Sequence, residues 1–214
     1  GFGYYLPSNY IANYTIWGST FIEITNFTDS VIGGNNVSFD GFIMNDLGVP
    51  LDRDIKILWD GITRTTVESI NGEFSGSFRL PYDTQVGNHS LIAKVDDQNY
   101  LRESSDEVEV FVQRETEIVI QWFGGYRNQS SVSSGYLRDA AGVGLSNLEL
   151  DFYFDGNFIG NVTTQDLGLY SFNFVVPTST TLGSHNLAAS FSGSYFYVES
   201  NNALNSEILA STNF

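Results

Sequence analysis

The chain has 214 residues, with 9 Lys and Arg against 25 Asp and Glu, giving a formal net charge of −16. A surface of this charge repels phosphate backbones, which makes nucleic acid a poor partner. The chain contains no Cys, which excludes disulfides and thiolate metal sites, and no stretch is long and apolar enough to span a membrane.

The remaining composition favours a secreted protein. Charged residues make up only 16 % of the chain, so its surface must be largely Ser, Thr, Asn, Gly and Tyr, which suits an extracellular protein that carries sugar. The chain starts with Gly1 rather than Met, which we interpret as removal of a signal peptide, although trimming would give the same result. We predict an extracellular or cell-surface location and no cofactor.

Residues 1–19 form an N-terminal tail that belongs to neither of the two repeats that follow. The tail has six aromatic residues, whereas disordered segments are poor in aromatics, and its alternation from residue 10 to residue 17 predicts a strand. Such a strand needs a partner sheet, which another subunit can supply. The alternative is that residues 10–25 form one long first strand on their own domain. The candidate donor-strand residues are Tyr4, Tyr5, Leu6, Tyr10, Ile11, Ala12, Tyr14, Ile16 and Trp17.

The rest of the chain consists of two related sequence repeats. Residues 20–27 match residues 116–123, residues 48–51 match residues 142–145, and residues 87–91 match residues 183–187, always at a spacing of 94 to 96. This spacing is typical of an immunoglobulin-like sandwich. We therefore predict two domains, residues 20–113 and 114–214.

Alternating apolar residues separated by turn residues predict an all-β fold with no helix. Asp155-Gly156 is a hairpin signal, because Gly readily adopts the positive φ that a tight turn requires. We expect two tandem immunoglobulin-like β-sandwiches of about seven strands each. The expected strands of the second repeat are residues 116–123, 131–138, 148–154, 158–164, 169–176, 185–191 and 207–211.

The first repeat contains a series of short motifs. They are Gly-Val-Pro-Leu at 48–51, Asp-Gly at 60–61, Gly-Glu-Phe at 72–74, Leu-Pro at 80–81 and Gly-Asn-His-Ser-Leu at 87–91. The pattern resembles the immunoglobulin-like repeats of bacterial and archaeal cell-surface proteins, over residues 20–212 in two units. That resemblance implies a role as a spacer, an adhesin stalk, or a component of a wall or filament.

The repeat spacing also assigns a place to the tail. A shift of 96 sets residues 10–17 against residues 106–113, where the final strand of a preceding domain would stand. The final strand of the second repeat, residues 206–214, is less apolar than its counterpart and leaves room for a donated strand. Its candidate acceptor edge is Ile208, Leu209 and Ala210. Head-to-tail donation of this kind builds an open polymer of identical subunits.

In these features the chain resembles a subunit of an archaeal extracellular filament of the thread or bundling-pilus type. No short motif certifies the resemblance, and both repeats have a full strand count, whereas an acceptor domain usually lacks a strand. The alternative is an adhesin or surface-layer-associated module that binds glycan or protein through loops such as residues 194–197.

Six Asn-X-Ser/Thr sequons occur, more than the roughly three or four that chance predicts, and N-linked glycans are expected partners. The candidate glycosylation sites are Asn13, Asn26, Asn36, Asn88, Asn128 and Asn161.

No motif of an enzyme is present, and we predict a protein without catalytic or metal-binding residues. His89 and His185 occupy the same place in the two repeats, which indicates a structural side chain at the start of a strand that bonds to a turn. The carboxylate pairs are expected to be solvated loop residues, with a loop calcium site at Asp96 and Asp97 as the alternative.

Overall fold

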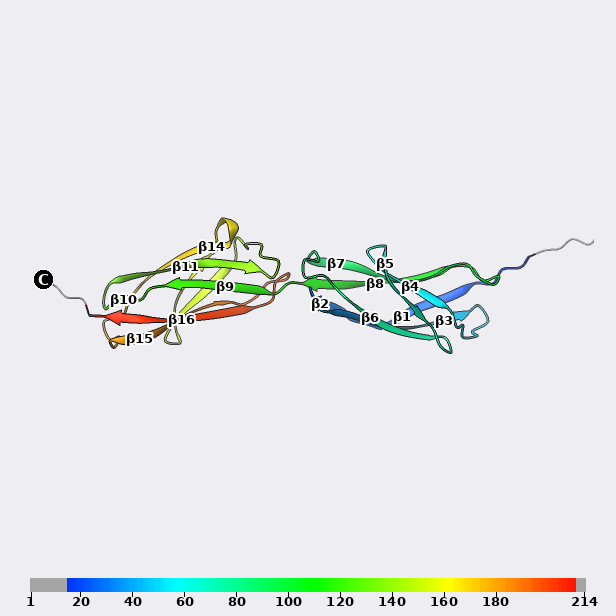
Figure 1. Ribbon diagram of the computed structural model, residues 1–214, viewed down its shortest axis with the longest axis horizontal. Coiled ribbons are helices and arrows are strands. Elements are labelled where there is room, and N and C mark those ends of the chain that lie inside the picture. Colours follow the sequence, from blue (N-terminus) through cyan, green and yellow to red (C-terminus); the bar gives the residue numbers. More distant parts are fainter. Residues whose placement is uncertain (1–14, 211–214) are drawn as a thin grey trace, which may run out of the picture. The chain divides into compact units, whose positions relative to one another are not determined.

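The computed structural model describes residues 15–210 of the chain (Figure 1). Within these residues the protein is all-β and forms two tandem immunoglobulin-like sandwiches, and its one helical element is the three-residue 3-10 turn η1 (Asp166–Gly168). The strands of the first repeat are β1 (Thr20–Phe27), β2 (Ser30–Ile32), β3 (Asn36–Asn45), β4 (Asp54–Trp59), β5 (Ile62–Glu68), β6 (Glu73–Arg79), β7 (Gly87–Val95) and β8 (Ser104–Gln113). Those of the second repeat are β9 (Thr116–Trp122), β10 (Gly125–Tyr126), β11 (Ser130–Asp139), β12 (Glu149–Phe154), β13 (Asn157–Thr163), β14 (Leu169–Val175), β15 (Gly183–Phe191) and β16 (Ser200–Leu209).

Each repeat builds one three-stranded and one five-stranded sheet. The order in the first repeat is β1-β3-β6 and β2-β8-β7-β4-β5, and the order in the second repeat is β14-β11-β9 and β10-β16-β15-β12-β13. Adding eight to any strand number in the first repeat gives its counterpart in the second. The repeat seen in the sequence is therefore a repeat of topology, and the all-β, tandem-sandwich prediction is confirmed.

The described residues separate into two compact units. One comprises residues 15–27, 38–77 and 90–108, and the other comprises residues 28–37, 78–89 and 109–210. The second unit holds the whole second sandwich together with three short segments of the first repeat. The domain limits at residues 20, 113 and 114 stay predictions from the repeat.

The hairpins show why the local sequence folds as it does. Asp60 and Gly61, and likewise Asp155 and Gly156, have positive φ angles of 50°, 78°, 48° and 78°. Two successive residues with positive φ match the right-handed twist of the flanking strands. The hairpin predicted from Asp155-Gly156 is confirmed, and its counterpart joins β4 to β5.

The core of the second repeat is rich in aromatic side chains that alternate along the strands. Phe152 and Phe172 stack with ring centroids 4.3 Å apart, and Trp122 Nε1 donates a hydrogen bond of 2.9 Å to Ser131 Oγ. This bond satisfies the only polar group of the indole, as burial of Trp requires. The buried cluster is Ile118, Trp122, Leu137, Leu145, Leu150, Phe152, Phe154, Tyr170, Phe172, Phe174, Val176, Leu187, Ala189, Phe191 and Ile208.

At one level of the core, the two repeats carry an aromatic side chain on different strands. In the first compact unit Gly76 of β6 makes room for Phe39 of β3, because a Cβ at Gly76 would lie 2.8 Å from Phe39 Cζ. The equivalent positions in the second repeat are Phe172 of β14 and Ser133 of β11, which face each other in the sheet. Close packing allows one aromatic ring at this level of the core, on either strand.

The predicted strands of the second repeat are confirmed, with two differences. β10, a two-residue strand that pairs in parallel with β16, was not predicted, because two residues carry no periodicity. β16 begins at Ser200 and not at residue 207. Its first half has no buried side chain, so alternation could not reveal it; nine cross-strand pairs with β15 hold the whole strand in place.

Candidate assembly surfaces

The tail meets the first compact unit at Gly18. Gly18 forms an isolated parallel bridge to Leu101: its N–H donates to Tyr100 O at 2.8 Å, and Arg102 N–H donates to Gly18 O at 3.0 Å. Asp46 N–H also donates to Ser19 O at 3.0 Å. A Cβ at residue 18 would lie 3.0 Å from Leu101 Cδ2, so a side chain there would require the Leu101 side chain to shift slightly. We call this contact the Gly18 bridge.

Apolar side chains beside the Gly18 bridge are exposed. The rings of Trp17 and Tyr100 meet edge to face with centroids 6.0 Å apart, yet Tyr100 is 65 % exposed and Trp17 43 % exposed. Ile16 is 84 % exposed. Exposed apolar groups of this size in one region are typical of an interaction surface.

The second compact unit repeats the Gly18 bridge at Arg114. Arg114 forms a parallel bridge to Tyr197, its N–H donates to Phe196 O at 3.0 Å, and Val198 N–H donates to Arg114 O at 2.9 Å. Ala140 N–H donates to Glu115 O at 2.9 Å, as Asp46 does to Ser19. Arg114 lies 96 residues after Gly18, and Tyr197 lies 96 residues after Leu101. The backbone pattern is therefore the same at both bridges.

The side chain of Arg114 adds contacts that Gly18 lacks. Its Nη1 lies 2.5 Å from Asp139 Oδ2, with side-chain exposures of 12 % and 1 %, and its Nη2 donates to Thr84 O at 2.6 Å and to Asp83 O at 3.3 Å. All of these residues belong to the second compact unit. A buried ion pair with further hydrogen bonds is costly to break, so Arg114 clamps this bridge.

Residue 45 shows that the first repeat is built without such a clamp. Asn45 Oδ1 accepts the amides of Leu47 and Val49, as Asp139 Oδ1 accepts those of Ala141 and Val143. The turn is the same, but a neutral amide stands where the second repeat has a carboxylate. Because residue 18 carries no guanidinium, the first repeat needs no carboxylate at residue 45 to pair with it.

The loop at residues 194–197 is engaged within its own compact unit. The ring of Phe111 lies 4.4 Å from that of Tyr195 and 6.1 Å from that of Phe196, and Gln113 Nε2 donates to Tyr195 O at 3.2 Å. Tyr195 is still 69 % exposed. The aromatic residues of the loop thus pack against Phe111, which weakens the case for the loop as a ligand-binding surface.

The candidate acceptor residues lie at the end of β16. Ile208 is fully buried and pairs with Gly183 of β15 on one side and Gly125 of β10 on the other. Leu209 is half-exposed and Ala210 is exposed. A donated strand would have to replace the two-residue pairing of β10 or extend it along β16.

Of the candidate donor residues, the structure describes Ile16 and Trp17, which lie outside any strand; β1 begins at Thr20. The others lie outside the described residues: Tyr4, Tyr5, Leu6, Tyr10, Ile11, Ala12 and Tyr14. Sequence reasoning missed Leu101 and Arg114 as contact residues. The spacing of 96 was the signal that could have found them, because it aligns Gly18 with Arg114.

Candidate glycosylation sites are accessible wherever they are described. Asn13 lies outside the described residues, and all five of the others are exposed: Asn26, Asn36, Asn88, Asn128 and Asn161.

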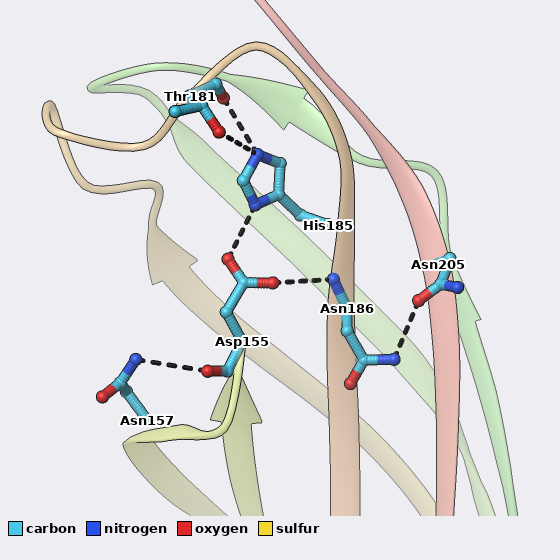
Figure 2. A network of polar contacts seen from close by, with 6 residues as sticks. All are labelled: Asp155, Asn157, Thr181, His185, Asn186 and Asn205. Carbon is cyan, nitrogen blue, oxygen red and sulfur yellow. Dashed lines mark hydrogen bonds and ion pairs between the residues drawn. The ribbon is translucent and has the colours of Figure 1, made fainter.

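His185 is the centre of a polar network at the start of β15. Figure 2 shows its ring between Asp155 and Thr181: Nδ1 lies 2.7 Å from Asp155 Oδ2, and Nε2 lies 2.9 Å from Thr181 O. Burial disfavours the charged form of Asp155, but the bonds from the Asn186 amide and from His185 offset it, so that the pKa of Asp155 lies below its ordinary value. The network ties a hairpin turn to a strand, as the sequence predicted for this His.

The acidic pairs show no metal centre in the described part of the chain. Asp96 Oδ2 lies 2.5 Å from Lys56 Nζ, and Asp97 accepts the amide of Glu103. Within residues 15–210 no group of three or more His, Asp or Glu side chains is arranged to hold a metal ion. In the same residues no helix is long and apolar enough to cross a membrane.

Comparison with protein families and with curated proteins finds no match. Solved structures with similar folds include the I67–I69 fragment of the titin I-band, at 9 % identity and a TM-score of 0.51, covering 89 % of this chain and 66 % of that one. They also include FdeC, an Escherichia coli adhesin, at 13 % identity and a TM-score of 0.50, covering 89 % of this chain and 64 % of that one. The chain thus spans about two thirds of each structure. These likenesses show the immunoglobulin-like fold.

Proposed function

We propose that the protein is an extracellular structural subunit that assembles head to tail with other copies of itself, each copy donating its N-terminal tail to the second sandwich of the next. The observation that carries this proposal is the repetition of one backbone pattern at Gly18 and Arg114. At Arg114, the residues just before the bridge form strand β8. The residues before Gly18 hold the same place in the repeat, so we infer that the tail is a β8-like strand that another copy completes.

The sparse side-chain burial of β16 and its nearly open outer edge support the choice of acceptor. Of its ten residues only Ile208 is buried, whereas β8 buries both Val110 and Val112. On its outer edge, β10 covers only two residues. Strand addition at such an edge gains main-chain hydrogen bonds and buries alternate side chains. Burial of Tyr10, Tyr14 and Ile16 would contribute roughly 1.5–3 kcal/mol each.

The exposed sequons support an extracellular location. An N-glycan is bulky and hydrophilic, and it needs an Asn at the surface. The five described sequon residues all meet this condition. A surface poor in charge then gains solubility from sugar.

The test compares the assembly state of the full chain with that of a chain lacking residues 1–17, by sedimentation and negative-stain microscopy. We expect polymers from the full chain and folded monomers from the shortened one. The double variant Tyr14→Asp/Ile16→Asp should behave as the shortened chain does, because two charges on the buried face of the donated strand prevent its burial. The matched control is Asn13→Asp/Thr15→Asp, which places equal charge on the opposite face and should still assemble; because it also removes the Asn13 sequon, all the proteins are compared without glycan.

Continued polymerisation of the Tyr14→Asp/Ile16→Asp protein would show that the tail is not donated. Monomers from every protein, including the full chain, would return the tail to its own domain and favour the adhesin or surface-layer module. Circular dichroism of each variant separates loss of assembly from loss of folding.

A further inference from the structure

The two repeats protect their sheet edges differently. The strands at one end of their sheets are β5 and β6 in the first repeat and β13 and β14 in the second. An edge strand exposes unpaired N–H and C=O groups, on which other chains can add strands, and natural proteins prevent this with charged side chains, bulges or a cover. Both hairpins carry a bulge, at residues 57–58 and 152–153. The bulge is therefore common to the repeats and cannot explain the difference.

Charge is the device that the second repeat lacks. β5 carries Arg64 and Glu68, and β6 carries Glu73 and Arg79. The counterparts β13 and β14, which lie beside each other, carry no charged residue at all. Their exposed side chains include three large apolar ones: Phe158 at 58 %, Leu169 at 51 % and Val175 at 62 %. An uncharged strand of high β-propensity without Pro is an aggregation hazard.

The uncharged edge contains a sequon in the middle of its strand. Asn161 of β13 is exposed and is paired with Asp151 of β12, whereas the next residue, Val162, is paired with the buried Leu150. Because side chains alternate along a strand, Asn161 points to the outer face. The exposed Phe158, whose ring packs against Tyr153 at 5.7 Å, lies on the same strand. No sequon occurs in β5, where the charges stand.

We propose that Asn161 carries an N-linked glycan that covers the β13–β14 edge. The glycan would prevent strand addition at this edge, as the charges of β5 and β6 do in the first repeat. The inference rests on the proposed extracellular location, but not on head-to-tail assembly. In the modification, Asn161 Nδ2 attacks the anomeric carbon of a lipid-linked oligosaccharide diphosphate. A C–N bond forms, the bond from that carbon to the phosphate oxygen breaks, the amide gives up one proton to the transferase, and the lipid diphosphate leaves.

The first measurement is the mass of the peptide that contains Asn161, from the full chain secreted by a glycosylating cell. We expect a glycan mass on this peptide and its loss after treatment with a peptide N-glycosidase. Thr163→Ser keeps the sequon and should keep the glycan, whereas Thr163→Ala and Asn161→Gln should remove it. An unmodified Asn161 in the wild-type protein would overturn the proposal.

The second measurement tests the edge itself, in the Tyr14→Asp/Ile16→Asp background so that tail donation does not contribute. Side-by-side association is followed by light scattering and sedimentation. Removal of the glycan by Asn161→Gln should lower the concentration at which copies associate by about tenfold, and Asn161→Lys should restore solubility through charge. Asn36→Gln, which removes a sequon outside this edge, is the matched control.

Equal solubility of the Asn161→Gln and parent proteins would show that no cover is needed and would overturn the inference. Association of the Asn161→Lys protein to the same extent as the Asn161→Gln protein would do the same. Since the peptide mass is read without any polymer, failure of this proposal and failure of the filament proposal give different results.

Discussion

The Gly18 and Arg114 bridges are the most informative pair of regions in the molecule. Both make the same parallel backbone contacts to the loop that precedes the last strand of their repeat. At Arg114 a guanidinium adds an ion pair to Asp139 and bonds to two carbonyls, whereas Gly18 has only its backbone. Backbone geometry thus determines where a chain crosses the end of a sandwich, and a side chain determines how firmly it is held there.

The same comparison extends to the cores and edges. One aromatic ring sits on β3 in the first repeat and on β14 in the second, and charged edges in the first repeat correspond to an uncharged edge with a sequon in the second. The topology tolerates all of these exchanges. The differences in the cores and at the bridges can be tested by carrying a feature of one repeat into the other.

The largest effect is expected from Ser133→Phe, which puts the ring of the first repeat into a core that already holds Phe172. Overpacking by a whole ring should cost more than about 3 kcal/mol of unfolding free energy. Adding Phe172→Gly recreates the Phe39 and Gly76 arrangement and should recover more than about 1 kcal/mol. Denaturant unfolding measures both. The exposed neighbour Val132→Phe is the control and should change stability by less than about 0.5 kcal/mol. A double variant no more stable than Ser133→Phe would refute the exchange.

Arg114→Ala makes the second bridge resemble the first. It leaves the carboxylate of Asp139, 1 % exposed, without its cation, and we expect a loss of about 3 kcal/mol. The control is Arg138→Ala, which removes an exposed ion pair with Glu117 and should cost less than about 1 kcal/mol. Equal losses for the two variants in urea unfolding would show that Arg114 does not clamp the bridge.

Tyr170 provides a third contrast, because its counterpart is Phe74. Burial raises the pKa of Tyr170 to about 12, so the folded protein favours the neutral phenol. The unfolded chain loses this proton first, near its ordinary value of about 10, so the stability contributed here is complete below pH 10 and falls as the pH rises towards 12. Tyr170→Phe should remove this part of the alkaline decline in the urea midpoint. Identical pH profiles for the two proteins would contradict it.

The smallest effect concerns Asp155, whose pKa is lowered in the folded protein. The ionised form is the one that the fold stabilises, so its contribution is present above the unfolded value of about 3.9 and is lost as the pH falls through the lower folded value. We expect Asp155→Asn to cost less than about 1 kcal/mol at pH 7, because the carboxylate is partly exposed. The cost should shrink as the pH falls below the unfolded value. A cost that persists in acid would assign it to altered packing.

Much of the fold could be predicted because its signals are local. Alternation reveals strands whose one face is buried, as in β12, and Asp-Gly reveals tight hairpins. The spacing of 94 to 96 reveals the duplication. Local signals failed where side chains are not buried, as in the first half of β16, which is held by pairing with β15, and in β10, which is too short to have a period.

The candidate sites divide in the same way. Sequons, the place of the tail in the repeat and the matched His positions depend on identity and spacing, which can be read along one chain. The clamp of Arg114 on Asp139 and Thr84, the packing of Phe111 on Tyr195, and the pairing of Ile208 on both sides join residues far apart in sequence. Such contacts depend on how strands are ordered in a sheet, and only the tertiary structure determines that order, because nothing in the periodicity of a strand specifies its neighbours.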